Sequence, residues 1–86
     1  MNIKHTIVEF DGVTEFAIGD VLFIPEEHLE VVKEIAGVDA DDPDAIYCYE
    51  LTMSQVSKIA AIVGEVITFK PDSTFSLQCY QVDNED

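Results

Sequence analysis

The chain of 86 residues carries eighteen Asp and Glu residues against four Lys and no Arg, which gives a formal net charge of −14 at pH 7. This charge argues against nucleic acid and anionic membranes as direct partners, because both would repel the chain, and it favours a basic partner. Hydrophobic residues make up 48% of the sequence, which excludes a disordered acidic tail and is enough for a core. At this length, we expect a single domain that spans 1–86.

A hairpin and a helix are predicted in the first half of the chain. Residues 3–10 are rich in β-branched side chains, an Asp-Gly turn signal follows at 11–12, and a second strand lies within 14–24. Pro25 suits the first position of a helix, and Gly37 is placed to end it. At about 100° per residue, the apolar side chains of this helix share one face and its glutamates share the opposite face, exposed to solvent.

A third strand and a second helix follow an acidic loop at 38–44. The strand is predicted over 45–51, where Tyr, Ile and Cys side chains gather. Thr52 and Gln55 have the spacing of a capping box, in which each side chain accepts a hydrogen bond from the backbone of the other. The helix that they open is predicted to end at Val63.

The last strand is predicted over 75–82, and residues 83–86 read as a frayed tail. Residues 66–69 form either a short strand or a connection. The predicted order is therefore ββαβαβ. The expected fold class is α+β: a single small domain with two helices packed on a mostly antiparallel sheet.

No catalytic motif is present in the sequence, so we expect no enzyme activity and no cofactor. The acidic run at 39–44 invites comparison with a calcium-binding loop, but Pro43 offers no side-chain ligand and Asp44 stands where the turn needs Gly. His5 and His28 lack the spacing of metal ligands, and a structural or surface role is expected for both. The sequence therefore predicts no metal site.

The expected location of the protein sets the expected state of its two cysteines. The sequence shows neither the apolar run of a signal peptide nor a stretch long enough to span a membrane, so a cytoplasmic location is expected. Cys48 and Cys79 should then be reduced, and their strand-like surroundings predict small buried hydrophobic side chains.

The candidate partner-binding residues are carboxylates that step along the first helix and cluster in the acidic loop, together with two tyrosines on one face of the third strand. One tyrosine could anchor a partner, although packing in the core is the alternative. The candidate residues are Glu26, Glu30, Glu34, Asp39, Asp41, Asp42, Asp44, Tyr47 and Tyr49.

Several short motifs resemble those of small acidic bacterial immunity proteins that are encoded beside polymorphic toxins, including contact-dependent growth inhibition systems. The motifs are Phe10-Asp11 with Thr14 and Phe16, Ile24-Pro25 leading to Leu29, Asp41-Asp42-Pro43, and Tyr49-Glu50-Leu51-Thr52 with Gln55. The resemblance implies an immunity protein that neutralises the toxic C-terminal domain of a cognate effector, expected to be a nuclease, by occluding its basic substrate groove.

Two other functions remain open from the sequence. The same acidic surface would suit a nucleic-acid mimic that inhibits a DNA- or RNA-binding defence protein. A structural or interaction domain without inhibitory activity, or a small-molecule binder, would be favoured by a large apolar pocket and by indifference to basic proteins. A toxin gene directly upstream would support immunity, whereas a phage operon would support mimicry.

Overall fold

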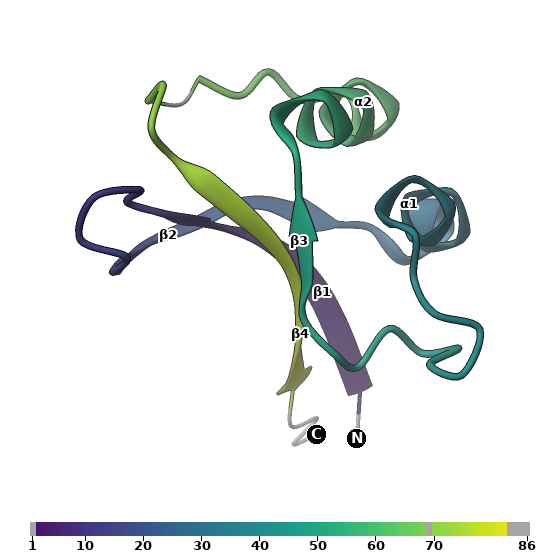
Figure 1. The fold of residues 1–86 in the computed structure, drawn as a ribbon. Coiled ribbons are helices and arrows are strands. Elements are labelled where there is room, and N and C mark those ends of the chain that lie inside the picture. Colours follow the sequence, from purple (N-terminus) through teal and green to yellow (C-terminus); the bar gives the residue numbers. More distant parts are fainter. Residues whose placement is uncertain (1, 69, 83–86) are drawn as a thin grey trace.

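The protein is described by a computed structural model that covers residues 2–68 and 70–82. The strands are β1 (Asn2–Phe10), β2 (Ala17–Ile24), β3 (Tyr49–Leu51) and β4 (Thr74–Val82). The helices are α1 (Leu29–Ala36), α2 (Met53–Val63) and a single 3₁₀ turn, η1 (Glu26–His28). This arrangement confirms the α+β class and the predicted ββαβαβ order (Figure 1).

One antiparallel sheet runs through the molecule in the strand order β2-β1-β4-β3. Odd-numbered residues of β1 and β4, such as Ile7, Phe75 and Leu77, face the helices, because side chains alternate along a strand. They pack with Val32 of α1 and Ile59 of α2 in a single hydrophobic core. Even-numbered residues of the same strands therefore face away from the helices.

The helix boundaries agree with the sequence except at one end. Gly37 and Gly64 end α1 and α2 in the left-handed conformation, with φ of 71° and 86°. The capping box is confirmed, since Thr52 Oγ1 accepts from Gln55 N at 3.1 Å and Gln55 Oε1 accepts from Thr52 N at 2.7 Å. Pro25 does not begin an α-helix: it precedes the 3₁₀ turn with ψ of 144°.

The third strand is shorter than predicted. It begins only at Tyr49, so the prediction of a strand from residue 45 is wrong for 45–48. Ala45 adopts a left-handed φ of 52°, and the amides of Ile46 and Tyr47 donate to the Asp42 side chain instead of joining the sheet. The acidic loop therefore extends from residue 38 to residue 48.

This longer loop also changes the surroundings of the cysteines. Cys48 is exposed in the loop and Cys79 is half-buried on β4, so the prediction of two buried thiols is wrong. Both are free thiols. Burial is the main reason that the pKa of Cys79 is raised.

The sequence-based predictions also concern the segment after α2 and the lengths of the helices. Residues 66–68 connect α2 to the last turn without forming a strand, while Phe69 and the predicted tail at 83–86 lie outside the described residues. Within the described ranges, neither α-helix has the length and apolar character that a membrane span requires.

The loop of the β1–β2 hairpin leans against the turn that precedes β4. A Cβ atom on Gly12 would lie 1.8 Å from the backbone oxygen of Asp72, so only glycine permits this approach. Lys70 Nζ lies 4.0 Å from Asp11 Oδ2, and Ser73 Oγ donates to the buried Glu9 carboxylate. Two of these contacts hold the hairpin loop in place, and the third ties the end of β1 to the same turn.

Replacing Gly12 by Ala should displace this loop from the 70–73 turn. We expect the substitution to lower the free energy of unfolding by about 1–3 kcal/mol, as overpacked sites do. Urea unfolding followed by circular dichroism measures the change. Val13→Ala is the matched control, because Val13 is an exposed neighbour in the same loop and should change stability by about 0.5 kcal/mol or less. Equal stability of the two variants would contradict the tight contact.

Candidate functional site

Seven exposed carboxylates stand on η1, α1 and the loop that follows. We call this set the acidic ridge, and its members are Glu26, Glu27, Glu30, Glu34, Asp39, Asp41 and Asp44. Lys33 is the lysine within it: its Nζ lies 3.2 Å from Glu30 Oε2 and also donates to the carbonyl of Pro43. Lys33 therefore joins α1 to the loop and leaves the ridge strongly negative.

Asp42 belongs to the same acidic run but has a different role. Its side chain is buried, with 5% of the residue exposed, and accepts from Ile46 N at 2.9 Å, Tyr47 N at 3.0 Å and the Tyr49 hydroxyl at 2.7 Å. Burial alone would raise the pKa of Asp42, but these three donors outweigh burial and hold the pKa below its ordinary value. Asp42 thus organises the loop, and its carboxylate is not among the exposed ones.

Further hydrogen bonds fix the loop on the sheet. The buried His5 donates from Nε2 to the carbonyls of Asp44 at 3.0 Å and Ala45 at 3.2 Å. Cys79 Sγ donates to the carbonyl of Ile46 at 3.2 Å. Asp39 Oδ1 accepts from Asp41 N at 3.1 Å. The ridge carboxylates of the loop are therefore carried on a pinned backbone.

The two tyrosines of the candidate set occupy different places. Tyr47 lies in the loop with 68% of the residue exposed, whereas Tyr49 lies on β3 and is half-buried. The prediction that they share a strand face is wrong, because the strand begins at Tyr49. Burial, together with the hydrogen bond to Asp42, raises the pKa of Tyr49. Tyr47 is thus the exposed aromatic side chain beside the ridge.

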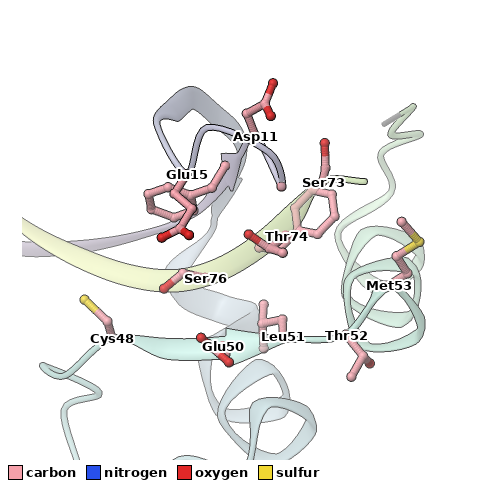
Figure 2. Close-up of a pocket in the computed structure, with 13 residues that line it drawn as sticks. Asp11, Glu15, Cys48, Glu50, Leu51, Thr52, Met53, Ser73, Thr74 and Ser76 are labelled. Atoms are coloured by element: carbon pink, nitrogen blue, oxygen red, sulfur yellow. The ribbon is translucent and has the colours of Figure 1, made fainter. Parts of the chain in front are cut away.

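A second acidic feature was not predicted from the sequence. A groove of about 830 Å³ lies between the hairpin loop and β3, over the first half of β4 (Figure 2). Three carboxylates line it: Asp11 and Glu15 from the hairpin loop and Glu50 from β3. We call it the acidic groove. Alternation along β3 places Glu50 on the face opposite Tyr49 and Leu51, but the nearness of Glu15 depends on the strand order, which no local pattern encodes.

Within residues 2–68 and 70–82, no group of three or more His, Cys, Asp or Glu side chains is arranged to hold a metal ion. The carboxylates are spread along a ridge and across a groove. Such a spread suits an extended cationic surface better than a single ion.

The Asp42 cluster should control the acid stability of the fold. The folded-state pKa of Asp42 is lowered, so its contribution to stability is fully present above the ordinary value of 3.8 and is lost as the pH falls through the folded-state pKa. We expect Asp42→Asn to lower Tm by roughly 4–8 °C at pH 7. The difference from wild type should shrink below about pH 4.

Asp41→Asn is the matched control, because Asp41 is an exposed neighbour and the substitution removes the same charge. It should leave Tm unchanged or slightly higher, since it relieves repulsion. Thermal unfolding at pH 7 and pH 3 measures both variants. A deficit of Asp42→Asn that is equally large at both pH values would show that ionisation of Asp42 is not the cause.

Comparison with known proteins places the chain in one family. No curated protein and no solved structure matched the sequence. A family described as a domain of unknown function, DUF7683, matches residues 4–73, which run from β1 to the turn before β4. The match includes the acidic ridge and all of the acidic groove except its β4 floor. Since it covers well over half of the sequence, the chain belongs to the DUF7683 family.

Proposed function

We propose that the protein is an immunity protein that binds the toxic C-terminal domain of a cognate bacterial effector and occludes its basic substrate groove. The observation that carries this proposal is the formal net charge of −14, with seven exposed carboxylates gathered on one ridge. A nuclease must neutralise phosphates with Lys and Arg, so its groove is basic. The ridge supplies the complementary charge.

The acidic ridge would increase the rate at which the two proteins associate. Complementary fields raise the association rate by 10-fold to 1,000-fold over that of an uncharged pair, and salt screens the effect. Glu30 and Glu34 lie one helical turn apart, about 6 Å along the axis of α1. The other exposed carboxylates of the ridge lie on η1 and on the loop that follows α1.

Affinity would come from apolar contacts beside the charges. Hot spots in interfaces are enriched in aromatic residues that become desolvated on binding. Tyr47 is 68% exposed and Ile46 is 47% exposed, and both lie in the loop that carries part of the ridge. Their backbone amides are held by Asp42, so little freedom is lost when a partner covers them. Binding by this route needs no catalysis, no cofactor and no metal, and it would take place in the cytoplasm of the producing cell.

The proposal is tested with the gene that lies next to this one in the genome. The C-terminal domain of the neighbouring effector is purified, its nuclease activity is measured, and this protein is added in increasing amounts. Stoichiometric inhibition with binding in the nanomolar range or tighter is expected. An active neighbouring nuclease that is neither bound nor inhibited would contradict the proposal. Inhibition of a phage-targeting DNA-binding protein instead would favour the mimic.

Charge reversal on the ridge should slow association. Glu26→Lys with Glu34→Lys changes two exposed carboxylates that make no ion pair with another described residue. We expect the association rate at low salt to fall roughly tenfold, with a smaller change in the dissociation rate. Stopped-flow binding at several salt concentrations measures both rates.

The control is Asp20→Lys with Glu65→Lys, which changes the net charge equally at exposed positions outside the ridge. It should slow association by a clearly smaller factor. If the two double variants slow binding alike, the charge acts only as a global field, and the ridge is not the contact face.

A further inference from the structure

The acidic groove holds two carboxylates that nothing else in the described chain uses. Asp11 is already engaged, because its Oδ1 accepts from Val13 N at 2.8 Å and from Thr14 N at 3.1 Å, which holds its pKa below the ordinary value. Glu15 and Glu50, in contrast, make no ion pair and no side-chain hydrogen bond with any residue of the described ranges. Both are exposed and line the groove from opposite walls (Figure 2).

The floor of the groove supplies an independent sign of a ligand. Ser76 stands directly opposite Glu50 in the β3–β4 pairing, and only 8% of the residue is exposed. Its hydroxyl has no hydrogen-bond partner among the described residues, and Figure 2 shows the side chain directed into the groove between the walls. The residue as a whole is nine-tenths buried, while the hydroxyl oxygen itself stays accessible from the groove, because no fully buried side-chain oxygen among the described residues lacks a partner. The Ser76 hydroxyl is therefore available to form a hydrogen bond with a ligand that enters the groove.

Backbone contacts hold both walls of the groove. The hairpin loop rests on the 70–73 turn through the close contact of Gly12 with Asp72. Glu15 is held at a left-handed φ of 66° while its backbone amide donates to the carbonyl of Asp11 at 2.8 Å. Glu50 is fixed by the pairing of β3 with β4. The backbone that carries the two carboxylates is therefore held before binding, which lowers the entropic cost of taking up a ligand.

The chemistry of the lining selects a donor-rich, elongated cation. Two free carboxylates and a free hydroxyl are all acceptors, and a guanidinium group offers five N–H donors in a planar fork. Phe10 and Met53 line the same groove and can cover the aliphatic stem of such a side chain. A metal ion fits less well, because these carboxylates do not converge with a third ligand in the described ranges.

We propose that the acidic groove receives an arginine side chain of the partner, with its guanidinium donating to Glu15, Glu50 and the Ser76 hydroxyl. The identity of the partner rests on the function proposed above, but the recognition of a guanidinium group does not. The groove thus adds a specific contact on the open face of the sheet, in addition to the charged ridge on the helix side.

The test uses the isolated protein and a small probe, N-acetyl-arginine amide, titrated at constant ionic strength and followed by two-dimensional amide NMR. We expect saturable shifts centred on Glu15, Glu50 and Ser76. The uncharged analogue N-acetyl-citrulline amide should give none of them. Calcium chloride at the same ionic strength should not reproduce them, and tighter binding of calcium than of the arginine probe at these residues would overturn the proposal.

Three variants separate specific binding from the general field. Glu15→Gln with Glu50→Gln should weaken binding of the arginine probe about tenfold, because two charge-assisted hydrogen bonds are lost. Ser76→Ala, which leaves the net charge unchanged, should weaken binding about threefold. Glu26→Gln with Glu34→Gln removes two ridge charges and should change binding by about twofold or less. If the ridge variant weakens binding as much as the groove variant, or if Ser76→Ala has no effect, the groove is not the binding site.

Failure of this inference can be distinguished from failure of the proposed function. If the arginine probe binds in the groove but the neighbouring effector is not inhibited, the groove is confirmed as a guanidinium site and the proposed immunity function is wrong. If the effector is inhibited and its affinity is unchanged by the Glu15 and Glu50 substitutions, the function stands and the groove is not part of the interface.

Discussion

The structure is constrained by its shortage of cationic side chains, because only four lysines are present to form ion pairs with eighteen carboxylates. Carboxylates that organise the fold therefore accept mainly from N–H and O–H donors, and of the three that follow only Asp11 also lies near a lysine, 4.0 Å from Lys70 Nζ. Asp42 takes two backbone amides and a tyrosine hydroxyl, Asp11 takes two backbone amides, and the buried Glu9 takes the hydroxyl of Ser73. Hydrogen bonds to an ionised acceptor are among the stronger ones, so they can hold a loop without a partner of opposite charge.

The use of some carboxylates as internal hydrogen-bond acceptors determines which carboxylates remain free to bind a partner. Those that organise a turn or loop, such as Asp42 and Asp11, are already engaged by backbone amides, and Asp42 is also buried. Two of those that are left stand on loops that the first group holds: Asp44 on the loop held by Asp42, and Glu15 on the loop held by Asp11. The self-repulsion of the free carboxylates costs stability, and a basic partner relieves it. Internal carboxylates therefore build the frame on which the external ones are displayed.

Sequence reasoning reached the features that depend on local patterns. Helix periodicity, the Thr52 capping box and the stop at Gly37 follow from neighbours a few residues apart, and all are present. The prediction of a strand from residue 45 was wrong because the Asp42 carboxylate accepts hydrogen bonds from backbone amides that would otherwise pair in the sheet. β-propensity does not take such side-chain hydrogen bonds into account. The acidic groove could not be found either, since it needs the hairpin loop to meet β3 across β4, and that meeting follows from long-range strand pairing.

The edge strand β3 connects the two acidic features. The loop with Tyr47 and Asp44 runs into β3 from the helix side, while Glu50 on β3 faces the groove on the open side of the sheet. An edge strand exposes unpaired backbone groups, and this one is only three residues long, which limits pairing with other strands. A partner centred on β3 would thus meet side chains rather than a strand edge. It would have ridge carboxylates on one side of its footprint and the groove on the other, so long-range attraction and specific recognition would act in one interface.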